Sequence, residues 1–179
     1  MLFNMKHPLD LFKYCPKCGS EQFNIHNEKS KKCLNCDFVY YFNPSAATVA
    51  VILNPKGQIL VCRRANEPAK GTLDLPGGFV DSFETGEEAV RREIKEETDL
   101  DAKDVRYLFS LPNLYMYSGF LVHTLDLFYL CKVDNTENLL GRDDISEAFF
   151  VDTHQLNIEE FGLQSIREGL SMLKKQNIL

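Results

Sequence analysis

Three glutamates between residues 93 and 97 carry the clearest chemistry in this sequence. Glu93, Glu96 and Glu97 occupy positions i, i+3 and i+4 of a segment with a helical pattern, and that spacing places all three carboxylates on one face within a single turn. Like charges so close repel one another, and a bound cation would relieve the repulsion. Oxygen ligands of this kind suit Mg²⁺ or Mn²⁺. Taken alone, the spacing is more commonly that of a solvated acidic face, and the flanking pattern is what favours a metal site.

Four cysteines near the N-terminus form a second group with metal-binding potential. They make two C-x-x-C pairs separated by fourteen residues, Cys15 with Cys18 and Cys33 with Cys36. This spacing is typical of a zinc site closed by four thiolates, which has no open position and is therefore structural. Free or disulfide-paired cysteines are the alternative. Cys62 and Cys131 stand alone in apolar runs, and we expect them to be buried core thiols.

The glutamates belong to a longer pattern that begins at Gly78. Five residues separate Gly78 from Glu84, and seven more lead to a run from Arg92 to Leu100. This stretch resembles the Nudix box, G-x5-E-x7-R-E-U-x-E-E-x-G-U with U apolar, at eight of its nine defined positions. Asp99 replaces the last glycine, and Asp is among the residues that tolerate the positive φ expected at a helix end. The resemblance covers the chain from about Asn43 to the C-terminus.

The resemblance implies a hydrolase that uses Mg²⁺ or Mn²⁺ to cleave a nucleoside diphosphate linked to another moiety. It assigns the metal to Glu93, Glu96 and Glu97, joined by the carbonyl region of Gly78. It makes Glu84 and Arg92 a pair that orients the loop and the helix. A carboxylate of the cluster, or one from a later loop, can accept the proton of the attacking water. The loop candidates are Asp143, Asp144 and Glu147, with Asp144 preferred, and surface acids without a role are the alternative.

A four-cysteine ribbon directly ahead of the box resembles the NADH pyrophosphatase subgroup. That subgroup carries a second signature, S-Q-P-W-P-F-P-x-S, and the segment from Ser110 to Ser118 matches it only at Ser110, Pro112 and Ser118, with an aromatic at Tyr115. The chain has no tryptophan. Tyr115 or Tyr117 can stack on a base or a nicotinamide ring, or else pack under a loop. The candidate substrate-binding residues are Arg63, Ser110, Tyr115 and Tyr117.

The two resemblances together favour hydrolysis of NADH or an NAD-type dinucleotide to AMP and a mononucleotide. ADP-ribose, a nucleotide sugar and an NAD-type cap on RNA stay open as substrates. A module that binds a nucleotide without cutting it is an alternative of another class, although the complete carboxylate set argues against it. The ribbon could also dock a protein partner, and the sequence leaves open whether the chain forms a homodimer.

The elements expected to position these residues divide the chain in two. Residues 1–43 form the ribbon, with 38–41 as its last strand, and residues 44–179 form the Nudix domain. Strands are predicted over 46–53 and 58–64, joined by a turn at 54–57, and further on over 105–110, 122–133 and 148–151. Thr85-Gly86-Glu87-Glu88 is a capping box that opens a helix to about Thr98. A last helix places Leu163, Ile166, Leu170 and Leu173 on one face. We expect an α+β fold, a mixed β-sheet flanked by helices.

Composition and charge exclude several other classes of protein. Hydrophobic residues make up 44% of the 179 residues and charged residues 26%, which is typical of a globular chain and not of a disordered one. No apolar run is long enough for a membrane span, and no signal peptide is evident, so a cytosolic location is expected. The net charge of −6 disfavours long nucleic acids. It is compatible with a small phosphorylated ligand, because a metal held by carboxylates attracts phosphate.

Overall fold

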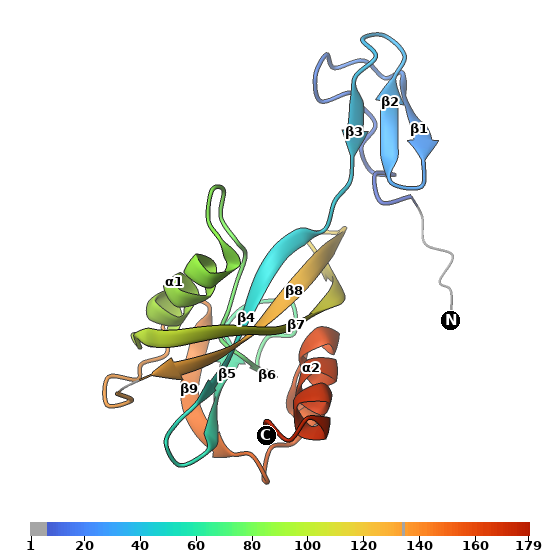
Figure 1. Cartoon of the computed structure of the whole chain (residues 1–179). Coiled ribbons are helices and arrows are strands. Elements are labelled where there is room, and N and C mark those ends of the chain that lie inside the picture. Colours follow the sequence, from blue (N-terminus) through green and yellow to red (C-terminus); the bar gives the residue numbers. More distant parts are fainter. Residues whose placement is uncertain (1–6, 134) are drawn as a thin grey trace.

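The computed structural model describes residues 7–133 and 135–179, which form two β-sheets (Figure 1). The first is a small antiparallel sheet of β1 (Phe23–Asn27), β2 (Ser30–Cys33) and β3 (Val39–Tyr41), in that order. Positive φ angles at Gly19 (73°) and Asp37 (56°) close the turns that follow the two C-x-x-C pairs. Aromatic contacts join this part to the larger sheet: the ring of Phe120 lies 5.8 Å from Phe12 and 6.2 Å from Phe42.

The larger sheet is mixed, as the sequence predicts. Its strands are β4 (Ser45–Leu53), β5 (Gln58–Arg64), β6 (Leu73–Asp74), β7 (Ala102–Tyr117), β8 (Phe120–Val133) and β9 (Ile145–Asp152). They follow the order β6-β5-β4-β8-β7, and β9 pairs with β5. Only β4 and β8 run parallel among these pairs. The helices are α1 (Gly86–Thr98) and α2 (Gln164–Lys175), with a 3-10 turn over Ile158–Glu160.

The two helices cover opposite faces of the larger sheet (Figure 1). Successive side chains of a strand point to opposite faces, so β4 supplies both cores. Val49 and Val51 pack with residues of α2, whereas Ala50 and Ile52 pack with residues of α1. The predicted α2 face is confirmed, since Ile166, Leu170 and Leu173 are all buried in the first of these cores. Among the described residues, no helix is both long and apolar enough to cross a membrane.

Strands β4 and β5 separate soon after their turn, and a loop fills the gap. Leu53 of β4 and Ile59 of β5 lie opposite each other where the two strands pair. Further along, β4 bonds to the loop over 76–80 instead: the N–H of Ala50 donates to the carbonyl of Pro76 at 2.8 Å, and the N–H of Thr48 donates to that of Gly78 at 2.8 Å. The loop that leads into α1 is therefore fixed to the centre of the sheet.

Helix α1 has the ends that its sequence predicts. The N–H of Glu88 donates to the Thr85 hydroxyl at 3.2 Å, and the Glu88 carboxylate accepts the N–H of Thr85 at 2.8 Å, which completes the capping box. The helix ends at Asp99, which adopts a φ of 59°. Aspartate therefore takes the left-handed position where the Nudix box has glycine.

The strand predicted over 105–110 is longer than expected. β7 continues to Tyr117 and pairs with β8 up to that residue. The chain reverses at Ser118 and Gly119, both with positive φ (48° and 74°), the signature of a two-residue hairpin turn. Pro112 is tolerated because β7 is the edge strand, where a missing N–H need not break a ladder bond.

Candidate active site

Arg92 connects three of the box glutamates. Its guanidinium donates two bonds of 2.9 Å to Glu84, one of 2.7 Å to Glu93 and one of 3.0 Å to Glu96. A further bond of 3.0 Å reaches the carbonyl of Phe79 in the incoming loop. The hydrogen bonds from Arg92, followed by one from the N–H of Asp81, lower the pKa of Glu84. The expected pairing of Glu84 with Arg92 is present, and it ties the loop to the helix.

Glu97 is the most buried carboxylate of the helix, with 6% of the residue exposed. Its Oε2 accepts the backbone N–H of Gly77 at 2.9 Å. Burial is the main cause that raises the pKa of Glu97 to about 9, and the charges of Glu93, Asp74 and Asp144 add to it. A buried carboxylate among other carboxylates is stabilised in its ionised form by a cation.

Gly77 and Gly78 allow the loop to lie close to both β4 and α1. A Cβ on Gly78 would lie 2.5 Å from Oε1 of Glu93, and one on Gly77 would lie 2.0 Å from the carbonyl oxygen of Thr48. A side chain at position 77 would displace the loop from β4, because it meets backbone, whereas one at position 78 would push the Glu93 carboxylate aside. The Gly78 carbonyl, expected near the metal, accepts the N–H of Thr48.

The carboxylate set fits a hard divalent cation by its chemistry. Its donors are all oxygen, and burial raises the pKa of Glu93 as well as that of Glu97. The carboxylate oxygens do not converge on one point: Glu93 and Glu96 share one guanidinium nitrogen of Arg92, whereas Glu97 accepts the N–H of Gly77. Within the described ranges, only the four cysteines bring three or more metal-binding groups within 4.8 Å of one another.

The glutamates open onto a cavity of about 810 Å³, within the usual range for small-molecule sites. Its walls come from α1, the 74–81 loop, β5, β7, β8, the 143–145 loop and the start of α2. Of the residues predicted from sequence, the cavity is lined by Gly78, Arg92, Glu93, Glu96, Glu97, Tyr115, Tyr117, Asp143 and Asp144. Carboxylates and rings that lie far apart in the sequence therefore share one space.

The loop acids separate into two groups. Asp143 and Asp144 line the cavity, and Oδ1 of Asp144 accepts a 2.6 Å bond from the side chain of Asn66. Glu147 instead bonds to Arg63 at 3.0 Å. Neither Arg63 nor Glu147 is among the lining residues.

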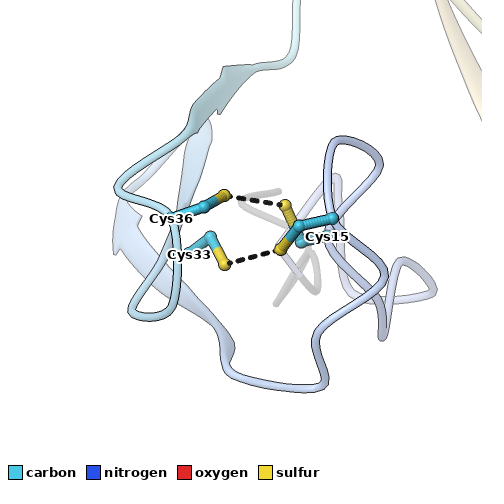
Figure 2. A group of neighbouring side chains, drawn as sticks. Cys15, Cys33 and Cys36 are labelled. Carbon is cyan, nitrogen blue, oxygen red and sulfur yellow. Dashed lines mark hydrogen bonds between the residues drawn. The ribbon is translucent and has the colours of Figure 1, made fainter.

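The cluster of four cysteines lies beside the small sheet, where Cys33 ends β2, and none of the four lines this cavity; Figure 2 labels Cys15, Cys33 and Cys36. The sulfurs of Cys15 and Cys36 are 3.8 Å apart, and those of Cys18 and Cys33 are 3.6 Å apart. Four thiolates around one zinc, each at about 2.3 Å, would be separated by about 3.8 Å along every edge of the tetrahedron. The thiols therefore fit a tetrahedral zinc ion. Cys62 and Cys131 are buried in the larger sheet, as predicted.

A model of the NUDIX domain matches residues 43–169. The chain belongs to the Nudix family. The ADP-ribose pyrophosphatase of Methanocaldococcus jannaschii is 39% identical over 118 residues, which cover 65% of this chain and 66% of that protein. The NAD-capped RNA hydrolase NudC of Vibrio vulnificus is 29% identical over 106 residues, covering 59% of this chain and 40% of that protein. The matches thus span less than two thirds of the length of either relative.

Solved structures agree on the fold. The crystal structure of a Nudix hydrolase from Nitrosomonas europaea aligns with a TM-score of 0.71, over 92% of this chain and 91% of that chain. The two sequences are only 20% identical, so this likeness supports the Nudix architecture alone.

Several residues of this Nudix cavity were not anticipated from the sequence. Arg64 lines it in place of its neighbour Arg63, and Arg64 donates a 2.5 Å bond to the buried Asp74. Strand alternation could have shown that only one of two consecutive arginines faces a given side. Ser110 is absent from the lining, whereas Asn113, Thr124 and Asp126 belong to it.

Proposed function

We propose that this chain hydrolyses the pyrophosphate bond of a nucleoside diphosphate derivative, with an NAD-type dinucleotide as the preferred substrate. The observation that carries the proposal is the buried Glu97, which shares one cavity with Glu93, Glu96 and the tyrosines of β7. An acidic cluster that lines the cavity has no use in a module that only binds an anionic nucleotide, because it would repel the phosphates. It suits a site that first recruits a cation.

In this proposal Glu93, Glu96 and Glu97 hold Mg²⁺ or Mn²⁺, together with the carbonyl region of Gly78. The ion, when bound, neutralises phosphate charge and makes water a better nucleophile. Arg92 keeps the glutamates and the loop in place through its bonds to Glu84 and Phe79. Water adds to one phosphorus, the bridging P–O bond breaks, and the products from a dinucleotide are AMP and a mononucleotide.

Asp144 is the proposed general base. It lines the cavity, its charge acts on Glu97, and Asn66 orients its carboxylate through a 2.6 Å bond. An oriented carboxylate can accept the proton that the water loses as it attacks. Asp144→Asn should then lower kcat much more than Asp143→Asn, and equal effects would remove the assignment.

ADP-ribose is the second candidate substrate. The relative with 39% identity carries the name ADP-ribose pyrophosphatase, whereas the NudC relatives are 29–32% identical. ADP-ribose and NAD share the ADP half, so the same cavity can serve both. An NAD-type cap on RNA presents the same dinucleotide.

A substrate panel tests the proposal. The protein is incubated with NADH, NAD⁺, ADP-ribose, Ap₄A and a nucleotide sugar, each with Mg²⁺ or Mn²⁺, and the products are identified by chromatography. Release of AMP from NADH or NAD⁺ is the expected result. Turnover of ADP-ribose without cleavage of either dinucleotide would select the second candidate, and no cleavage at all would favour a binding module.

We also propose that residues 1–43 form a separate ribbon around one structural zinc, followed by the catalytic domain over 44–179. The small sheet ends at Tyr41, and the family match begins at residue 43, which supports this boundary. Four thiolate ligands leave no position for substrate. One zinc per chain by elemental analysis is expected, and metal-free protein purified without chelator would contradict it.

A further inference from the structure

The inner face of the β7–β8 hairpin carries polar side chains that hydrolysis does not use. Asn113, Thr124 and Asp126 line the same cavity as Glu97, and each is at most 5% exposed. Asn113 and Thr124 lie directly opposite each other in the antiparallel register. Polar groups this deeply buried normally have hydrogen-bond partners.

Two of these side chains are fully engaged. The Asp126 carboxylate accepts one 2.6 Å bond from the hydroxyl of Thr124 and another from the hydroxyl of Ser165 at the start of α2. The bond from Ser165 joins the hairpin to α2, and both bonds keep the acid in place. The acid contributes negative potential to this wall of the cavity.

Asn113 differs from its neighbours because its Oδ1 has no partner. It is the one buried side-chain nitrogen or oxygen atom, among the residues the structure describes, without a hydrogen bond. Leaving a buried acceptor unpaired costs folding free energy. The side chain lines the cavity, although Oδ1 itself has less than 1 Å² exposed, so a turn of the amide would bring this acceptor to a ligand that donates to it.

Resting on the function proposed above, we propose that Asn113 is a specificity-determining residue that binds the exocyclic amino group of a planar ring in the substrate. A carboxamide presents an acceptor beside a donor, which matches an edge with an amino group beside a ring nitrogen or carbonyl. Both adenine and the carboxamide of nicotinamide offer such an edge. The negative charge of Asp126 disfavours rings whose edge presents only hydrogen-bond acceptors. Tyr115 lies two residues from Asn113 on the same face of the strand.

Two pairs of substrates separate the two sources of this chemistry. ADP-ribose and IDP-ribose differ at the 6-amino group of the base, whereas NAD⁺ and nicotinic acid adenine dinucleotide differ at the pyridine amide. For wild-type protein, kcat/KM should favour the amino-bearing member of one pair by at least about tenfold, as a bidentate amide contact allows. The pair that shows the preference identifies the ring that Asn113 binds.

Asn113→Leu keeps the branched shape and the number of side-chain heavy atoms, with larger terminal groups, and removes the hydrogen bond. It should bring the preferred ratio close to one, while the melting temperature stays equal to or above that of wild type, because an unpaired polar atom is lost. Leu114→Asn is the matched control, since Leu114 lies on the opposite face of the same strand and outside the cavity lining. It should keep the wild-type ratio.

Equal hydrolysis within both pairs by wild-type protein, or an unchanged ratio in Asn113→Leu, would overturn the inference while leaving the hydrolase proposal intact. If no substrate is cleaved, the hydrolase proposal fails, and the role of Asn113 is tested by ligand binding instead. Thermal shifts are then compared for AMP against IMP, and for nicotinamide mononucleotide against its acid. A preference that Asn113→Leu removes supports the inference, and equal shifts reject it.

Discussion

The Glu97 carboxylate accepts a 2.9 Å hydrogen bond from the backbone N–H of Gly77, twenty residues earlier in the chain. This bond joins the last turn of α1 to the loop that fills the gap between β4 and β5. It satisfies only one oxygen of a carboxylate that burial and neighbouring acids disfavour as an anion. Glu97 is thus both a structural link and the clearest place for a cation to act.

Glu97→Gln should separate these two roles. The amide oxygen can still accept the Gly77 bond, so the fold should persist, whereas the metal site loses a charged ligand. We expect kcat to fall at least about 100-fold, since a metal ion contributes several kcal/mol and about 1.4 kcal/mol is worth tenfold. In metal-free buffer at neutral pH the melting temperature should stay level or rise, because glutamine does not have to take up the proton that the buried Glu97 carboxylate binds when the protein folds.

The control for Glu97→Gln is Glu87→Gln, on the same helix but outside the cavity lining. Steady-state kinetics at saturating Mg²⁺ and thermal melts in chelator provide the two readouts. Near wild-type activity for Glu97→Gln would mean that the acidic face is only solvated.

Arg92→Lys should lower activity without removing the positive charge. A lysine ammonium is a single point charge, and it cannot bond at once to Glu84, Glu93, Glu96 and the Phe79 carbonyl as the planar guanidinium does. Loss of groups that orient metal ligands typically costs about 10–100-fold in metal affinity or activity. Activity is measured as a function of Mn²⁺ concentration. Most of the loss should appear as a higher Mn²⁺ concentration needed for half-maximal activity.

Arg91→Lys is the neighbouring comparison for Arg92→Lys. The Arg91 side chain donates to the carbonyls of Ala102 and Lys103 instead of to the box glutamates. Its replacement should leave metal activation unchanged. An equal effect of both substitutions would point to general damage to α1.

Thiol reactivity should divide the six cysteines into two classes. Burial raises the pKa of Cys131 to about 12 and raises that of Cys62 as well, and the thiolate is the reactive form. With chelator present, a chromogenic disulfide reagent should therefore titrate four thiols, those of the N-terminal cysteine cluster, while releasing one zinc per chain. The remaining two should react only in denaturant. Six fast thiols in folded protein would contradict the buried assignment.

The parts of the site that the sequence predicts are those set by local spacing. The limits of α1 follow from the Thr85 capping box and from Asp99, which takes the left-handed conformation. The cluster of four cysteines follows from two tight turns. In both cases, residues close in sequence must be close in space, so a pattern alone is sufficient.

The other parts of the site depend on the pairing of segments that are distant in the sequence, and no local pattern predicts that pairing. Asn113 matters only because it pairs with Thr124 of a distant strand and lines the cavity, and nothing in the residues beside it in the sequence marks it out. Arg63 and Arg64 are indistinguishable until the pairing of β5 with β9 and β6 is known. The extension of β7 beyond Ser110 is hidden by Pro112, because only its edge position makes proline acceptable there.

Tyr115 is the aromatic side chain of β7 best placed to stack on the substrate. It lines the cavity beside Asn113 and is partly buried, whereas Tyr117 is 56% exposed near the hairpin turn. Burial, followed by the charge of Asp126, raises the pKa of the Tyr115 phenol, so the ring stays neutral across the working pH range.

Tyr115→Ala should lower kcat/KM by about 1–3 kcal/mol, or roughly 5–150-fold, by analogy with base–aromatic stacking. Tyr115→Phe retains the ring and should stay close to wild type, whereas Tyr117→Ala should have a smaller effect than Tyr115→Ala. A loss confined to kcat/KM with an unchanged melting temperature would identify a substrate contact, because a packing defect lowers stability first. If Tyr115→Phe were as impaired as Tyr115→Ala, the hydroxyl and not the ring would be the functional group, and stacking would be excluded.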